Sequence, residues 1–189
     1  MYIGLFIFPF ITVVGQQSNH ERILTEHKVE EDDDIMWRER NITKEDFLLK
    51  SNPSSKILAT SCTGIFMIRR KEFNMEYRAM AIFSKSRSVI NPKLFTKVIG
   101  YQNYLIAHEQ LHFDITEVCT RALNSDLERL HVTDNKIATK LYNKYQDIWN
   151  NLEEAYDEQT NNGNDIEQQE IWHNRIKTLL EQSITCKSN

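Results

Sequence analysis

Glycine and proline are scarce in this chain, which contains five glycines and three prolines among 189 residues. Sandwiches and barrels with many strands need many tight turns, so this scarcity favours helices joined by few turns. The sequence contains no G-x-G-x-x-G or G-x-x-x-x-G-K motif, which argues against a Rossmann or P-loop phosphate binder. The formal net charge of −4 provides no overall basic field, so nucleic acid is not expected as a partner.

Cysteine is also infrequent, with three residues at wide and unpatterned spacing: Cys62, Cys119 and Cys186. This arrangement is neither a disulfide framework nor a cysteine-based zinc site. In an exported protein two of the three could form a bridge. The simpler interpretation is that all three are partly buried small hydrophobic residues.

No hydrophobic run is long enough to span a membrane. Residues 2–14 form an uncharged apolar stretch, which as a helix would rise only about 20 Å against a bilayer core of roughly 30 Å. The length suits a signal peptide, and we predict one at residues 1–17, although no Lys or Arg precedes Arg22. We therefore predict a secreted or periplasmic protein whose mature chain has no membrane-spanning segment. The alternative for this stretch is a buried apolar strand.

The polar residues 18–34 end in the acidic run 30–34, a composition typical of a solvated linker. We expect residues 35–185 to form one domain, because 40% of the chain is hydrophobic and its length allows a sizeable core. Near the start of this domain, Thr43 is followed three residues later by Asp46. That spacing is the pattern of a capping box and predicts a helix start.

The hydrophobic pattern changes from strands to helices along the domain. Residues 57–69 are rich in β-branched and aromatic residues, and residues 75–83 alternate with a period of two, so we predict an antiparallel hairpin. After Pro92 the periodicity predicts helices at 97–130, from a Thr133 cap to about 155, and at 167–183. A small antiparallel sheet followed by a helical half defines the α+β class.

The predicted helix 97–130 carries His108-Glu109-Gln110-Leu111-His112, an H-E-x-x-H motif. Four residues advance a helix by about 40° beyond a full turn, so both imidazoles project from one face and can share a metal ion. Glu109 lies about 100° round the helix from His108, beside the ligands, where it can act as a general base. The alternative is a pair of surface histidines with a salt-bridging glutamate.

The stretch YLIAHEQLHFDITE, residues 104–117, resembles the signature HEQxHFDIxE of DUF922, a bacterial family described as secreted zinc-dependent proteases. Arg121 matches an arginine that follows this signature. Tyr156 to Thr160 matches the family's YDxxT segment, and Gln169 and Trp172 match its later Q and W. The resemblance covers about residues 35–180.

This resemblance implies a zincin-like fold, a Zn²⁺ cofactor and a peptide or protein substrate. The chain departs from the family at Asn162, where relatives have a histidine before the glycine, and at residues 86–89, which lack the family's tryptophan. If that histidine binds the metal in relatives, activity here is weakened. The alternative function is therefore a catalytically weakened or inactive member that acts as a binding protein.

A catalytic zinc requires a third protein ligand besides His108 and His112. Glu117 lies about 180° round an unbroken helix from His108, and is interpreted instead as an ion pair with Arg121. We predict Asp157 as the third ligand, because carboxylate is an accepted ligand and the residue lies in the family-like segment. Asp157 could alternatively only turn the chain beside Thr160. The other candidates are His173, Glu154 and Asn162.

The sequence therefore predicts a secreted zinc-dependent metallohydrolase, most simply a metalloprotease, in which His108, His112 and Asp157 hold zinc and Glu109 is the general base. By analogy with other H-E-x-x-H folds, an extended substrate could pair with residues 75–83 as an edge strand. A third interpretation is a purely structural helical protein in which the motif is accidental.

Overall fold

The computed structural model describes residues 34–50, 58–70 and 76–185. Within these residues the chain is α+β, as predicted, with two small sheets and a helical half. The first sheet has the strand order β1-β5-β4 and is antiparallel. In the second, with the order β2-β6-β3, β6 pairs parallel to β2 and antiparallel to β3. The strands are β1 (Ile35–Met36), β2 (Leu48–Leu49), β3 (Ala59–Thr60), β4 (Thr63–Arg70), β5 (Glu76–Phe83) and β6 (Val89–Ile90).

Strands β4 and β5 form the predicted hairpin, with Thr63 opposite Phe83 at one end and Arg70 opposite Glu76 at the other. Alternate residues of β5 are buried against the helices, as the period of two requires. The hypothesis that residues 75–83 offer an edge to substrate is wrong. Strand β5 lies between β1 and β4, and the Asn124 side chain of α2 bonds both the N–H and the C=O of Ala79.

The helical elements are η1 (Lys44–Asp46), α1 (Pro92–Phe95), η2 (Thr96–Tyr101), α2 (Gln102–Arg129), α3 (Asn135–Gln159) and α4 (Ile166–Thr185). The predicted helix 97–130 begins instead with the 3₁₀ segment η2, which contains the non-helical residue Val98. A β-branched residue close to Gly100 gives this segment weak helix propensity.

The start of α3 also differs from its prediction. Thr133 is not the cap, because the Asp134 side chain accepts the hydrogen bond from the Ile137 N–H, and the helix runs on to Gln159. Helix α4 extends one to two residues beyond its predicted limits at each end. At residues 43–46 the capping box is present, but it starts a single 3₁₀ turn.

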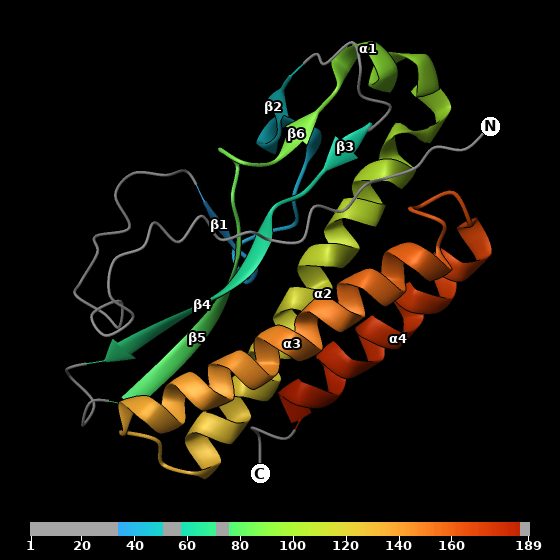
Figure 1. The fold of residues 1–189 in the computed structure, drawn as a ribbon. Coiled ribbons are helices and arrows are strands. Elements are labelled where there is room, and N and C mark those ends of the chain that lie inside the picture. The colour runs from blue at the N-terminus through green and yellow to red at the C-terminus, as the bar shows by residue number, and fades with distance from the viewer. Residues whose placement is uncertain (1–33, 51–57, 71–75, 186–189) are drawn as a thin grey trace.

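Helix α2 is the centre of the fold, with the sheets on one side and the α3–α4 pair on the other (Figure 1). One core cluster joins the β4–β5 hairpin to all three long helices, and includes Leu111, Ile115 and Leu123 of α2. A second cluster surrounds Phe83 and Phe113 near both small sheets. Because both flanks of α2 are packed, the histidine motif on it lies inside the protein.

Some sequence predictions concern residues whose structure is not described. The signal peptide at residues 1–17 lies outside the described residues, as does the linker at 18–34 apart from Asp34. Cys62 and Cys119 are buried free thiols, as the simpler interpretation held. Among the helices described, none is both apolar enough and long enough to cross a membrane.

Candidate metal site

Three buried side chains converge where α2 packs against α3. Asp157 Oδ1 lies 3.3 Å from His108 Nε2 and 3.1 Å from His112 Nε2. One possible ligand atom from each residue lies within 4.8 Å of the other two. Only 2% of His108, 8% of His112 and 5% of Asp157 is exposed. The structure therefore brings together the three residues predicted as ligands, and this cluster could hold a metal ion.

The ring of His108 is fixed by contacts on the side away from Asp157. Its Nδ1 lies 2.7 Å from the Tyr156 hydroxyl and 3.1 Å from Gln169 Oε1. The Gln169 carbonyl oxygen can only accept a hydrogen bond, so this contact favours a proton on Nδ1. The Tyr156 ring also stacks on the imidazole at a centroid distance of 4.8 Å. These contacts leave the Nε2 lone pair of His108 facing the cluster.

Gly163 completes the packing around His108. This glycine has φ +74°, and a Cβ placed on it would lie 3.0 Å from both Cγ and Nδ1 of the imidazole. Its carbonyl accepts a hydrogen bond from the Tyr101 hydroxyl. The loop after α3 can therefore approach the histidine closely only because residue 163 has no side chain.

His112 has a different outer partner, the carboxylate of Glu153 on α3. Glu153 Oε2 contacts Nδ1 of the imidazole directly. The other carboxylate oxygen accepts a hydrogen bond of 3.0 Å from the Trp149 indole N–H. With Nδ1 occupied in this way, Nε2 of His112 faces Asp157. An oriented imidazole with a carboxylate behind it is a common arrangement in metal sites.

The carboxylates of Asp157 and Glu153 lie against His112 and shift its titration. Burial raises the pKa of Asp157, but the nearby His112 and His108 outweigh it and hold the pKa below its usual range. Burial lowers the pKa of His112, and the charges of Glu153 and Asp157 outweigh that and raise the pKa well above its usual value. Without an ion, the two carboxylates therefore favour the protonated form of His112.

The residues present fit a divalent cation. Asp157 Oδ1 is buried and faces the Nε2 atoms of both imidazoles, so the three atoms surround a position that an ion could occupy. Two imidazole nitrogens and one carboxylate oxygen form a donor set typical of zinc sites with an open position. An ion would satisfy the oxygen and neutralise the negative charge together.

Glu109 lies beside the cluster, as the helix geometry predicted. Its carboxylate is 3% exposed, and Oε2 accepts a hydrogen bond of 2.8 Å from the Ser61 N–H that follows β3. Burial, and then the negative charges of Glu109 and Asp157, raise the pKa of Tyr156 far above its usual value. Glu109 and Asp157 therefore both lie near the Tyr156 hydroxyl. Ser61 thus fixes one oxygen of the predicted general base.

Two other acids on α2, Glu117 and Asp114, have partners outside the cluster. Glu117 forms the predicted ion pair with Arg121, at 2.7 Å. Asp114 accepts hydrogen bonds from the Trp37 indole and the Gln110 amide. Both residues therefore have structural partners of their own.

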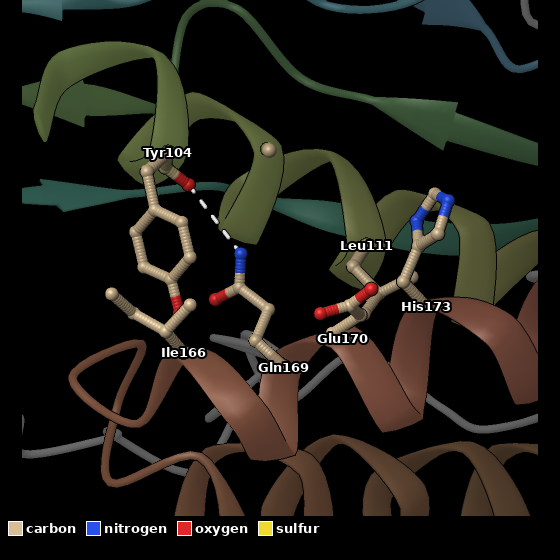
Figure 2. Close-up of a pocket in the computed structure, with 7 residues that line it drawn as sticks. Tyr104, Leu111, Ile166, Gln169, Glu170 and His173 are labelled. Carbon is tan, nitrogen blue, oxygen red and sulfur yellow. Dashed lines mark hydrogen bonds between the residues drawn. The ribbon is translucent and has the colours of Figure 1, made fainter.

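The remaining candidates for the third ligand do not reach the two motif histidines with a ligand atom. Glu154 and His173 are exposed, and His173 lines a separate pocket of about 240 Å³ between α2 and α4 (Figure 2). Asn162 has φ +53°, and its backbone N–H donates to the Asp157 carbonyl. Of these candidates, only Asp157 has its carboxylate at both histidines.

The sequence pattern gave no role to Glu153, and Ser61 and Gln169 belong to segments that matched only through the family resemblance. A signal for Glu153 was present, because Trp149, Glu153 and Asp157 are spaced four residues apart and share one helix face. Ser61 contributes a backbone N–H, for which no residue type is diagnostic.

Comparison of the chain with models of protein families, with curated proteins and with solved structures gives no match. The resemblance to DUF922 therefore stays a prediction.

Proposed function

We propose that the protein is a zinc-dependent metallohydrolase that cleaves peptide bonds. The observation that carries this proposal is the convergence of His108 Nε2, His112 Nε2 and Asp157 Oδ1 in a buried cluster beside Glu109. Two histidines, one carboxylate and an adjacent glutamate are the set that hydrolytic zinc sites use.

Each residue has a distinct role in this proposal. The two histidines and Asp157 would hold the ion, leaving a coordination position open for reactants. When bound, zinc would act as a Lewis acid that activates the attacking water and polarises the carbonyl of the scissile bond. Glu109 would accept the proton of that water and later deliver it to the leaving amine.

The position of Glu109 supports its role. Its Oε2 accepts a hydrogen bond from the Ser61 N–H, which positions one oxygen of the carboxylate. The carboxylate therefore need not reorganise before it reacts.

The choice of zinc, the zincin-like class and the peptide substrate rest on the motif and its resemblance to DUF922. A nitrogen-rich set with one carboxylate suits zinc better than calcium or magnesium, which prefer oxygen ligands. Export to the periplasm or the medium is part of the proposal and rests on the apolar run at residues 2–14. Amino-terminal sequencing of the exported protein tests it, because cleavage near residue 17 is expected.

The central experiment measures bound zinc and peptide cleavage in the purified protein. The wild type should retain about one zinc per chain and cleave a mixed peptide library. Glu109→Gln should keep the zinc and lose cleavage by about 10²–10⁴-fold, since it removes the base alone. His112→Ala and Asp157→Ala should lose cleavage and should no longer retain zinc through purification, leaving only a weak affinity that titration can measure. His173→Ala is the matched control, an exposed histidine removed without effect.

Two results would contradict the proposal. A wild-type protein that binds no zinc would remove the metal site. Full cleavage by Glu109→Gln would remove the general base.

A second candidate function is a binding protein that keeps the metal site without turnover. The observation that favours it is Asn162, which stands where the family has a histidine. A wild type that retains zinc and binds peptides, but cleaves none in the library, would favour this function over the hydrolase.

A further inference from the structure

Behind the three candidate ligands, the two histidines have outer partners of unequal charge. His108 Nδ1 faces the neutral groups of Gln169 and Tyr156, whereas His112 Nδ1 faces the carboxylate of Glu153. A carboxylate that accepts from an imidazole N–H makes the other ring nitrogen a stronger donor to a metal. The two imidazoles are therefore not equivalent.

We propose that Glu153 is a positioning residue that commits His112 to metal binding through Nε2. It would do so by holding the proton of the imidazole on Nδ1 and by fixing the rotation of the ring. This inference rests on the proposed function and adds to it a residue that acts through His112 without touching the ion.

Glu153 is itself held by residues on both sides. The Trp149 indole N–H donates to Oε1 at 3.0 Å and also lies 3.0 Å from the Thr116 hydroxyl oxygen. Thr116 in turn donates to the His112 carbonyl or to Thr63 of β4, each at 2.9 Å. Both oxygens of Glu153 are thus engaged, which limits the orientations open to the carboxylate.

The sequence position of Glu153 explains how one helix brings two carboxylates, its own and that of Asp157, to His112. Asp157 lies one helical turn further along α3, so the outer carboxylate and the candidate ligand share one face of the same helix. Because α3 carries both, a single docking arrangement of α3 on α2 places the imidazole between them.

The test is the zinc affinity of Glu153→Gln, measured by competition with a chelator. Glutamine keeps the size and the carbonyl acceptor but removes the charge, so affinity should fall by about 10–100-fold. Glu154→Gln is the matched control, because it makes the same change of charge at the next residue, which is exposed. The control should change affinity by less than about threefold. Equal affinities in the two variants would overturn the proposal.

A double-mutant cycle separates positioning from a general effect of charge. In the His112→Ala background, Glu153→Gln should cause no further loss of affinity, because the residue through which it acts is gone. The same fold-loss in both backgrounds would show that Glu153 acts by another route.

A measurement on the wild type keeps the inference testable if Glu153→Gln does not fold. Long-range ¹H–¹⁵N NMR of the zinc-loaded protein assigns the tautomer of each histidine. His112 should carry its proton on Nδ1 and bind zinc through Nε2, and binding through Nδ1 would overturn the inference. Failure of the wild type to bind zinc would instead remove the proposed function, so the two failures are distinguishable.

Discussion

Gly163 offers the sharpest test of how the loop after α3 supports the site. The change is Gly163→Ala, which adds one methyl group at a residue with φ +74°. An alanine in this left-handed region costs about 1–2 kcal/mol. The new Cβ would also lie 3.0 Å from two atoms of the His108 ring, and such overpacking costs about 1–3 kcal/mol.

Together these terms predict a loss of about 2–5 kcal/mol in the free energy of unfolding. A protein of this size shifts its melting temperature by about 2–4 °C per kcal/mol, so calorimetry should show a fall of about 4–20 °C. The zinc-dependent rise in melting temperature should also shrink, because the displaced His108 binds the ion less tightly.

Gly100→Ala is the control for this experiment. A Cβ at Gly100 meets no atom within 4 Å, and the residue is not in the left-handed region. Its melting temperature should stay the same or rise slightly, because alanine restricts the unfolded chain. If Gly163→Ala melts within about 2 °C of this control and zinc raises both melting temperatures equally, the loop does not require glycine at residue 163 to pack on His108.

Two further predictions concern Asp46 and Asn162. Arg40 and the Thr43 N–H outweigh the burial of Asp46 and lower its pKa to about 2, so its stabilisation is full above about pH 4 and is lost as the pH falls towards 2. Because Arg40 is 46% exposed, we expect Asp46 to contribute about 1–2 kcal/mol to the free energy of unfolding. When the stability of Asp46→Asn is measured against pH, the loss between about pH 4 and pH 2 should be smaller by this amount. Asn162→His should leave zinc affinity unchanged if Asp157 is the third ligand, and a tenfold tighter affinity measured by chelator competition would show otherwise.

Periodicity and local chemistry were sufficient to predict the long elements. The hairpin, the three long helices and the capping pair at residues 43–46 all follow from side-chain patterns within a few residues. The common face of His108 and His112 is likewise a local property of an α-helix. Such features depend little on how the elements pack.

Features that depend on packing were missed. Strands β2 and β6 have two residues each, too few for any period to show, and β6 pairs with segments distant in sequence. Glu153 was overlooked because its role depends on which face of α3 meets α2. The exclusion of β5 as a substrate edge depends on Asn124, whose side chain gives no sign in the sequence of bonding a strand.

The division of the candidate ligands between two helices has a consequence for folding. Helix α2 alone offers only two donor atoms, and the third arrives with α3, which follows later in the chain. A nascent or partly unfolded chain could therefore bind an ion only weakly. Tight binding would require that α2 and α3 have already docked, and the bound ion would then slow the separation of the two helices.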